Sequence, residues 1–423
     1  MKLLHAADLH IDSPLRGLAF VDGVPADEVR SATRRAFVNL IDLALAESVD
    51  VLLLAGDIFD GDWRDHQTGV FFAKELKRLE ARDVRVFVAR GNHDAESQIS
   101  LHVALPRNVT VFGSGVVETH RMPALGLAVH GWSFDRQAVT ENVARRFPQP
   151  VPGVLNVGVL HTNLDGQAGH SNYAPCSTDD LRAHGYDYWA LGHVHTRRHQ
   201  EFGRTHIVYP GNLQGRHARE VSAEGKGATL VTATAAGVTC VEHRVLDVVR
   251  WLACEVDIAG VTSRDEVVRM IAEQVTNATR ATGRVGVARV TLTGATSLHR
   301  EWALHEREIS AALVAHLGQG AYVEKIVCST QDVDTAVGLD DTLAAITTAV
   351  ARASMDPALR QALCDAVGNR LGHILGVDGE RALAAAELRL PTGVDPAGVD
   401  ALLQAAAQRL AGRLRPSRPA QRS

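Results

Sequence analysis

The sequence predicts an α/β protein in which a sheet is covered by helices, followed by a small α/β module and a helical end. Three observations lead to this prediction. From residue 1 to about 247, short apolar runs typical of strands alternate with amphipathic stretches. The same alternation continues on a smaller scale between about 250 and 330, and from Leu339 onward the apolar spacing is helical.

The first segment contains apolar runs that predict buried strands at Val51–Leu54, Val84–Val88 and Val157–Leu160. Between the strands, residues 27–47 and 67–82 have the spacing of amphipathic helices. We therefore assign residues 1–247 to one α/β domain.

The second segment, residues 250–330, predicts three more strands, at Trp251–Asp257, Val285–Thr293 and Tyr322–Val327. A helix is expected near residues 263–281, and another before the last strand. This is the pattern of a small α/β domain.

Residues 336–412 carry apolar stripes at helical spacing, such as Leu339, Leu343 and Ile346 on one face. These stripes indicate either a helical bundle that packs on itself or a surface for a partner. The last segment, residues 413–423, is basic and contains proline, so we expect a disordered tail.

Composition excludes several classes of protein. With 423 residues, 46% of them hydrophobic, the chain can build two or three globular domains. A formal charge of -5 argues against coating nucleic acid by overall charge, so any such contact depends on local basic clusters or bound metal. The five cysteines form no CxxC pair and are expected to be reduced packing residues. No apolar run suits a signal peptide or a membrane span, so the expected location is the cytoplasm.

Five polar clusters directly follow apolar runs, and this placement predicts a site. They are Asp8-Leu9-His10, Gly56 to Asp60, Gly91 to Asp94, His161, and Gly192 to His195. If the strands that end at residues 7, 55, 89, 160 and 191 lie side by side, these clusters meet along one rim. Asp8 with His10, and His193 with His195, can each present two side chains to one cavity. The glycines at 56, 91 and 192 suit sharp backbone turns.

The ligand types favour borderline transition metals. Imidazole with carboxylate and amide oxygen suits Mn, Fe, Zn or Ni better than Ca, and the lack of thiolate argues against a structural zinc site. Two divalent ions bring four positive charges, of which Asp8 and Asp57 offset two, while the histidines bind as neutral rings. The filled site would stay positive and attract phosphate.

The ordered set D-x-H, G-D-x-x-D, G-N-H-D, H and G-H-x-H resembles that of calcineurin-like metallophosphoesterases, over residues 1 to about 215. The resemblance implies a β-sandwich flanked by helices in four layers. It also implies that Asp8, His10 and His195 hold one metal, that Asn92, His161 and His193 hold the other, and that Asp57 bridges them. Phosphodiester hydrolysis would follow from a metal-bridging hydroxide, with Mn²⁺ as the expected metal and Fe²⁺, Zn²⁺ or Ni²⁺ as alternatives.

Three further residues receive roles beside the metals. His93, next to Asn92, is placed to protonate the leaving oxygen or to stabilise charge on the phosphate. Asp94 is expected to orient His93 through a hydrogen bond, and Asp60 to support the site rather than to bind a metal.

Residues 7–15, 57–65 and 209–216 resemble parts of bacterial SbcD-like and YhaO-like DNA-repair exonuclease subunits. This resemblance implies a DNA exonuclease or endonuclease that acts as a homodimer, with residues 250–330 as a capping domain and the C-terminal helices docked on an SMC-like, SbcC-type ATPase. No G-x-x-x-x-G-K-[ST] motif occurs in the chain, so the ATPase would be a separate subunit. On the loops after the last metal motif, Arg197, Arg198 and Arg216 are candidates for contact with DNA.

The other histidines predict less. His5 is expected to be a packing residue of the first strand, and His199, His206 and His217 are expected to be ordinary loop histidines. Two other functions stay open: a stand-alone phosphodiesterase or phosphatase that acts on small nucleotides or phosphoproteins, and a non-catalytic scaffold. The complete set of candidate ligands argues against the scaffold.

Overall fold

The computed structural model describes residues 1–13, 15, 31–60, 66–96, 104–166, 172–299, 309 and 311–331. The chain divides into two compact units, Met1–Thr330 and Gln331–Ser423, and the named helices and strands belong to the first. The helical stripes predicted for residues 336–412 and the tail 413–423 lie outside the described residues.

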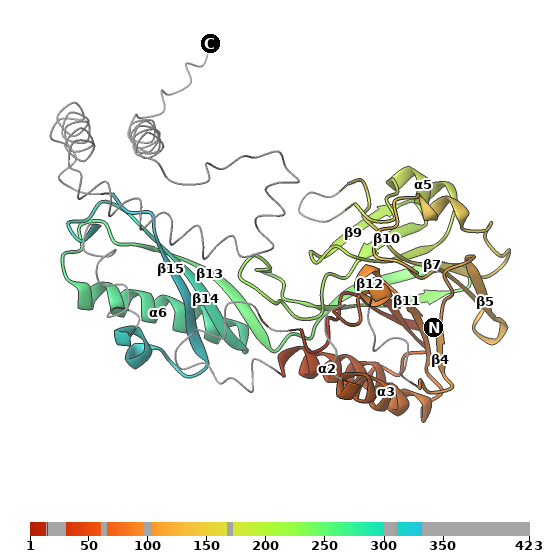
Figure 1. Ribbon diagram of the computed structural model, residues 1–423, viewed down its shortest axis with the longest axis horizontal. Helices are drawn as coiled ribbons and strands as arrows, with labels where there is room; N and C mark the ends of the chain where they lie inside the picture. Colours follow the sequence, from red (N-terminus) through yellow and green to blue (C-terminus); the bar gives the residue numbers. More distant parts are fainter. Residues whose placement is uncertain are drawn as a thin grey trace, which may run out of the picture. The chain divides into compact units, whose positions relative to one another are not determined.

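Two six-stranded sheets form the core of the first unit (Figure 1). The first sheet has the order β12-β11-β1-β2-β3-β4, and the second has the order β5-β6-β7-β8-β10-β9. Strands β1 to β4 are parallel, whereas β11 pairs antiparallel with β1 on one side and with β12 on the other. The bounds of the first sheet are β1 Lys2–Ala6, β2 Val51–Ala55, β3 Arg85–Ala89, β4 Val109–Val111, β11 Gly227–Thr234 and β12 Gly237–Val245. Those of the second are β5 Glu118–Met122, β6 Leu127–Gly131, β7 Leu155–His161, β8 Tyr188–Gly192, β9 Arg198–Phe202 and β10 Thr205–Tyr209.

Strand β2 shows how the layers form, because all five of its residues are buried. Leu53 packs between the two sheets, whereas Leu52 and Leu54 point to the opposite face, towards helices α2 (Ala32–Ala46) and α3 (His66–Glu80). A strand that is covered on both faces must be apolar at every position, which explains the continuous run in the sequence.

Short helices cover the outer face of the second sheet. Leu181 of α5 (Thr178–Ala183) and Val143 of η3 (Val143–Arg146) pack with Trp189 of β8 in one buried cluster. The order of layers is therefore helix, sheet, sheet, helix, which confirms the predicted four-layer α/β sandwich. Two further short helices, α4 (Asn92–Glu96) and η2 (Pro123–Leu125), connect strands.

A third sheet follows in the chain, with the parallel order β13 (Val249–Asp257), β14 (Val285–Thr293) and β15 (Ala321–Cys328). Helix α6 (Arg264–Thr282) covers it with an apolar face that includes Val267 and Ile271. These elements agree with the strands and the first helix predicted for the second segment. No helix in the described part of the chain is long and apolar enough to cross a membrane.

The clusters would meet along one rim if the five site-bearing strands lay side by side, but these strands are divided between the two sheets. Strands β1, β2 and β3 belong to the first sheet, and β7 and β8 to the second. The carboxyl ends of these strands still converge, because the sheets are stacked with β2 against β7 and β8. The site therefore lies at one edge of a sandwich.

The expectation that all five cysteines are packing residues is partly wrong. Cys176 and Cys254 are buried and free, as expected, but Cys240 and Cys328 are exposed. Cys240 lies on the edge strand β12, and Cys328 ends β15, so neither is covered by a neighbouring layer. Cys364 lies outside the described residues.

Candidate metal centre

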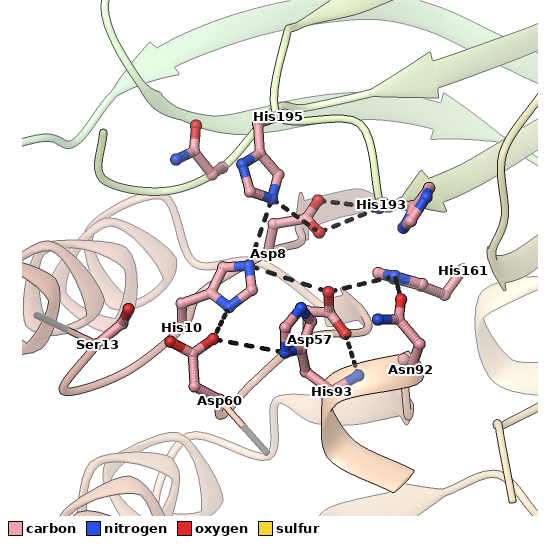
Figure 2. A network of polar contacts seen from close by, with 12 residues as sticks. Asp8, His10, Ser13, Asp57, Asp60, Asn92, His93, His161, His193 and His195 are labelled. Atoms are coloured by element: carbon pink, nitrogen blue, oxygen red, sulfur yellow. Dashed lines mark hydrogen bonds and ion pairs between the residues drawn. The ribbon is translucent and has the colours of Figure 1, made fainter. Parts of the chain in front are cut away.

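The predicted ligands come together at the ends of five strands (Figure 2). Asp8 and His10 follow β1, Asp57 follows β2, Asn92 begins α4 after β3, His161 ends β7, and His193 and His195 follow β8. All of these side chains except that of His195 belong to buried residues. The structure thus gathers seven predicted ligands that span 188 positions of the sequence, from 8 to 195.

The first group consists of Asp8, His10 and His195, whose ligand atoms all lie within 4.8 Å of one another. His10 Nε2 is 3.3 Å from His195 Nε2, and His195 Nε2 is 3.9 Å from Asp8 Oδ1. The Asp8 carboxylate is held in place because it accepts the backbone N–H of His193.

The second group consists of Asp57, His161 and His193, again with ligand atoms within 4.8 Å of one another. Asn92 adds an amide oxygen, since its Oδ1 lies 3.1 Å from His161 Nε2. Each of the three residues of this group is buried.

Asp57 belongs to the second group but also faces His10 of the first group (Figure 2). Its Oδ2 is 3.4 Å from His161 Nε2 and 3.9 Å from His10 Nε2. Its other oxygen accepts the backbone N–H of His93 at 3.0 Å. One carboxylate oxygen therefore faces both groups, which is the position that a bridging ligand requires.

The histidine rings are oriented by oxygen atoms behind them. Nδ1 of His10 lies 2.6 Å from Asp60 Oδ1, Nδ1 of His195 lies 2.6 Å from Glu220 Oε1, and Nδ1 of His161 lies 2.9 Å from the carbonyl of Ala55. Because these oxygens accept a hydrogen bond from Nδ1, each Nε2 faces the centre, where it can serve as a metal ligand.

The donor set fits a bound cation. His10 Nε2 and His195 Nε2 face each other at 3.3 Å, and each ring has a carboxylate at its Nδ1, so both Nε2 atoms can bind one cation. Two imidazole nitrogens on one tetrahedral ion lie about 3.3 Å apart, given metal–nitrogen bonds of about 2.0–2.1 Å. His161 Nε2 likewise faces the oxygens of Asn92 and Asp57, so these three atoms can also bind one cation.

The pKa values reflect this demand for positive charge. Burial lowers the pKa of His161, but the adjacent Asp57 carboxylate outweighs burial and raises it to about 9. Burial likewise raises the pKa of Asp57, yet the neighbouring His161 and His10 hold it well below its usual range. A proton on His161 thus supplies in the metal-free chain the positive charge that a metal ion would bring.

The backbone is strained at four candidate ligands. Asp8, His10, Asp57 and His193 have positive φ angles of 52°, 43°, 53° and 105°. Such conformations cost about 1–3 kcal/mol each and persist only where the surroundings enforce them. Hydrogen bonds across the sheets provide this support, for example from Asp8 N to Gly56 O and from His10 N to Asp57 O.

The glycines beside the ligands have two different roles. Gly56 has a φ of 92°, which confirms the predicted turn. Gly192 instead permits a close contact, because a Cβ there would lie 1.8 Å from the carbonyl oxygen of Ala55. A Cβ on Gly91 would lie 2.2 Å from Asp57 Oδ1, so both of these glycines are required by packing.

The expectation that Asp94 orients His93 is wrong. The Asp94 carboxylate is buried and accepts the backbone N–H groups of Ile58, Phe59 and Gly91. Burial and the nearby Asp57 raise the pKa of Asp94 to about 6. Asp94 fixes the loops after β2 and β3, and its oxygens are engaged in that task.

Asp60 is the carboxylate that faces His93, with Oδ1 3.8 Å from His93 Nδ1. The same oxygen lies against His10 Nδ1, which agrees with the supporting role expected for Asp60. Burial raises the pKa of Asp60, but the bond to His10 and the charge of Arg216 hold it well below its usual range. Asp60 therefore stays charged beside both histidines.

Sequence reasoning missed Glu220 and Lys226. Glu220 accepts hydrogen bonds from His195 Nδ1, from Asn212 Nδ2 at 2.9 Å and from the backbone N–H of Arg216 at 2.7 Å. The Lys226 ammonium donates to the carbonyl of His195 at 2.6 Å, and burial lowers its pKa. No motif marks either residue, because both act through contacts that only the folded loop creates.

The three candidate DNA-contacting arginines lie in different surroundings. Arg216 Nη1 donates to Ser13 Oγ at 3.1 Å and lies 3.3 Å from Asp60 Oδ1, so this side chain belongs to the rim of the centre. Arg197 pairs with Glu224 at 3.3 Å. Arg198 is exposed and begins β9, so the expectation that it lies on a loop is wrong.

The remaining histidines differ from one another. His5 is fully buried, contacts the Tyr188 hydroxyl and the Leu191 carbonyl, and has its pKa lowered by burial to about 3, which confirms a packing role. His199 and His206 lie on β9 and β10, not on loops, because the segment after His195 forms a hairpin. His217 does lie on a loop, 3.5 Å from Glu220.

Comparisons with known proteins agree with this geometry. Residues 1–197 match the model of the calcineurin-like phosphoesterases, and residues 251–331 match the model of the middle domain of metallophosphoesterase YhaO.

Three relatives illustrate the range of similarity. The "Uncharacterized metallophosphoesterase YhaO" of Bacillus subtilis is 34% identical over 64% of this chain and 66% of its own length. The "DNA double-strand break repair protein Mre11" of Sulfurisphaera tokodaii is 26% identical over 54% of this chain and 59% of its own. A subunit of the SbcCD nuclease of Rhodobacter capsulatus is 30% identical over 33% of this chain and 31% of its own. The chain thus spans less than two thirds of the length of each of these relatives.

Proposed function

We infer from the match of residues 1–197 that the chain belongs to the calcineurin-like phosphoesterase family of metal-dependent hydrolases. From this premise we propose that it cleaves the phosphodiester bonds of DNA with the help of two divalent ions. The observation that carries this proposal is the position of Asp57. One of its oxygens faces His161 Nε2 at 3.4 Å and His10 Nε2 at 3.9 Å, so a single carboxylate serves two adjacent ligand groups. A pair of ions so placed suits in-line displacement at phosphorus.

The ligands would divide between two ions. In our proposal Asp8, His10 and His195 hold one ion, Asn92, His161 and His193 hold the other, and Asp57 is shared. Mn²⁺ is the proposed metal, with Fe²⁺, Zn²⁺ and Ni²⁺ as alternatives, because imidazole and oxygen ligands suit all four. When bound, the ions supply positive charge for the phosphate oxygens and lower the pKa of water at the site.

His93 is the proposed general acid. Its side chain is 39% exposed, so it can reach a substrate above the buried ligands. Its backbone N–H is fixed by Asp57, its ring meets that of His10 edge to face, and its Nδ1 faces the charged Asp60. In our proposal this ring donates a proton to the leaving oxygen.

Arg216 is the proposed contact to the DNA backbone at the centre. One of its nitrogens is engaged by Ser13 and Asp60, which fixes the guanidinium at the rim. A guanidinium has five N–H donors, so others are left for a phosphate oxygen. Arg197 and Arg198 are proposed as further, peripheral contacts.

The choice of DNA as the substrate class is supported by two relatives, one named as a DNA double-strand break repair protein and one as part of a nuclease. By the same analogy we propose that the chain is a nuclease subunit that forms a homodimer and works in DNA repair with a separate SMC-like, SbcC-type ATPase. Residues 250–330 would then be a capping domain, and residues 336–412 would dock on the ATPase.

The test is Mn²⁺-dependent digestion of end-labelled linear DNA by the full chain, beside hydrolysis of a small phosphodiester. His93→Ala should lower kcat by about 10²–10⁴-fold, the usual contribution of a general acid, while the number of bound Mn²⁺ ions stays the same. His120→Ala is the matched control, because its side chain has a similar exposure and lies on β5, away from the ligands.

The other outcomes separate the alternatives. Hydrolysis of the small ester with intact DNA, even after addition of an ATPase partner, would favour a phosphodiesterase or phosphatase for small substrates. A chain that binds two ions but hydrolyses neither substrate would be a scaffold.

A further inference from the structure

A third group of potential ligands lies apart from the metal centre, on the hairpin of β9 and β10. It consists of His199, Glu201 and His206, whose ligand atoms lie within 4.8 Å of one another. None of the three belongs to the seven candidate ligands of the metal centre.

The strand register explains why these side chains meet. His199 and Glu201 are two residues apart on β9, so they project from the same face of the sheet. His206 on β10 is directly opposite Glu201, and Val208 is directly opposite His199. Because Val208 packs between the two sheets, the three ligands lie on that inner face, at the edge strand of the second sheet.

The distances suit one ion. His199 Nε2 is 3.0 Å from His206 Nδ1, close to the separation of about 3.3 Å expected for two imidazole ligands of a tetrahedral ion. Glu201 Oε2 is 4.0 Å from His206 Nδ1, and its side chain is 61% exposed. A rotation of this exposed side chain can bring its oxygen nearer, since little packs against it.

The surroundings allow a cation to bind. Glu201 supplies a negative charge, and the nearby Arg197 is paired with Glu224. An imidazole binds a metal ion as the neutral ring, and both ring nitrogens that face each other here, His199 Nε2 and His206 Nδ1, can serve as ligand atoms. In the metal-free chain a single ring N–H shared between His199 and His206 satisfies both nitrogens.

We propose that His199, Glu201 and His206 form a separate binding site for one borderline divalent cation, of which Zn²⁺ is the best match. Two imidazoles and one carboxylate are a common set of protein ligands for zinc and leave a fourth position for water. Softer or harder ions fit less well, because the site offers neither a thiolate nor a cage of oxygen atoms.

Such a site would hold together a hairpin that supports the metal centre. Strand β9 begins three residues after His195, and β10 ends three residues before Asn212, which bonds to Glu220. A bound ion would cross-link the two strands close to both connections. Its expected effect is on the stability of the hairpin, and it touches no residue of the proposed reaction.

The test counts Zn²⁺ bound to the metal-free full chain at equilibrium, by dialysis and elemental analysis. The wild type should bind one more ion per chain than His199→Gln. Glu201→Gln should weaken that extra site by at least about 100-fold, since loss of even an outer-shell partner costs 10–100-fold in metal affinity. Gln200→Ala is the matched control, because this exposed residue of β9 projects from the opposite face and should leave the count unchanged.

Two results would overturn the proposal. One is an equal count and equal affinity for the wild type, His199→Gln and Glu201→Gln. The other is a lower count in His199→Gln that is accompanied by loss of Mn²⁺-dependent hydrolysis, because the lost ion would then belong to the metal centre. Retained hydrolysis with one ion fewer supports a separate site and also shows that His199→Gln is folded.

Discussion

Glu220 offers a sharp test of how the metal centre is held together. Its Oε1 accepts a hydrogen bond from His195 Nδ1 at 2.6 Å, while Oε2 accepts from Asn212 and from the backbone of Arg216. Burial raises the pKa of Glu220, but the hydrogen bonds and charges of His195 and Arg216 together hold it well below its usual range, so the group is charged at neutral pH. We therefore choose Glu220→Gln, which keeps the shape of the side chain and removes its charge.

The magnitude follows from the hydrogen bonds. A glutamine has one acceptor oxygen for the three donors that Glu220 serves, and its NH₂ group must face at least one of them. Either His195 loses its orienting partner or Asn212 and Arg216 lose theirs. Loss of such a partner lowers metal affinity by about 10–100-fold, or roughly 1.4–2.7 kcal/mol.

The assay is the Mn²⁺ concentration that gives half-maximal hydrolysis of a small phosphodiester. Glu220→Gln should raise it by about 10–100-fold while kcat at saturating Mn²⁺ changes little, because His195 is weakened as a ligand and the reacting groups are intact. Glu224→Gln is the control, since this exposed residue of the same loop pairs with Arg197. An unchanged Mn²⁺ requirement in folded Glu220→Gln would refute the argument.

Three further predictions concern stability, measured by urea unfolding of the metal-free chain. Gly192→Ala should cost about 3 kcal/mol or more, because a Cβ would lie 1.8 Å from a backbone oxygen, whereas Gly115→Ala, with open space around it, should be nearly neutral. Asp94→Ala should cost about 3 kcal/mol or more, since three backbone N–H groups lose their acceptor; a cost below about 1 kcal/mol would contradict that role. The pKa of His5, about 3 when folded, lies below its unfolded value, so the unfolded chain binds the extra proton and stability falls as pH drops from about 6.5 towards 3. His5→Gln should make this dependence shallower by up to about 1.4 kcal/mol per pH unit, and an identical slope would contradict the burial of a neutral ring.

The candidate ligands could be predicted because each follows an apolar run directly. A buried strand can be recognised in the sequence as an apolar run, and the chain leaves the core where that run ends. Asp8, Asp57 and His161 could therefore be identified as groups at strand ends. The division of the strands into two sheets was not legible, because an apolar run shows that a strand is covered on both faces and does not show what covers it. A covering helix and a covering second sheet require the same apolar residues in the strand, so the sequence does not distinguish them.

The supporting role of Asp60 was predicted, but those of Asp94 and Glu220 could not be, for a different reason. The part played by Asp94 depends on where the amides of two loops lie, and the part played by Glu220 depends on the path of the chain after β10. Adjacency in sequence favoured a pair between Asp94 and His93, but successive residues at the start of a helix point in different directions. The partner of His93 is therefore Asp60, which is distant in the sequence.

The loop between residues 212 and 220 connects the metal centre to the third sheet. Its two ends meet, because Asn212 donates a hydrogen bond to Glu220, and Glu220 in turn orients the ring of His195. In the middle, Gln214 accepts the backbone N–H groups of Val248 and Val249 and donates to the carbonyl of Val249, at the start of β13.

A second contact strengthens this connection, because the indole N–H of Trp251 donates to the carbonyl of Gly215 at 3.0 Å. A Cβ on Gly215 would lie 2.9 Å from the Trp251 ring, so the loop and β13 are in close packing contact. These groups are buried, and breaking such hydrogen bonds would cost about 1–3 kcal/mol for each group left without a partner. A displacement of β13 must therefore either break these hydrogen bonds or carry the loop with it. If the loop moves with β13, the Glu220 carboxylate that orients His195 moves too.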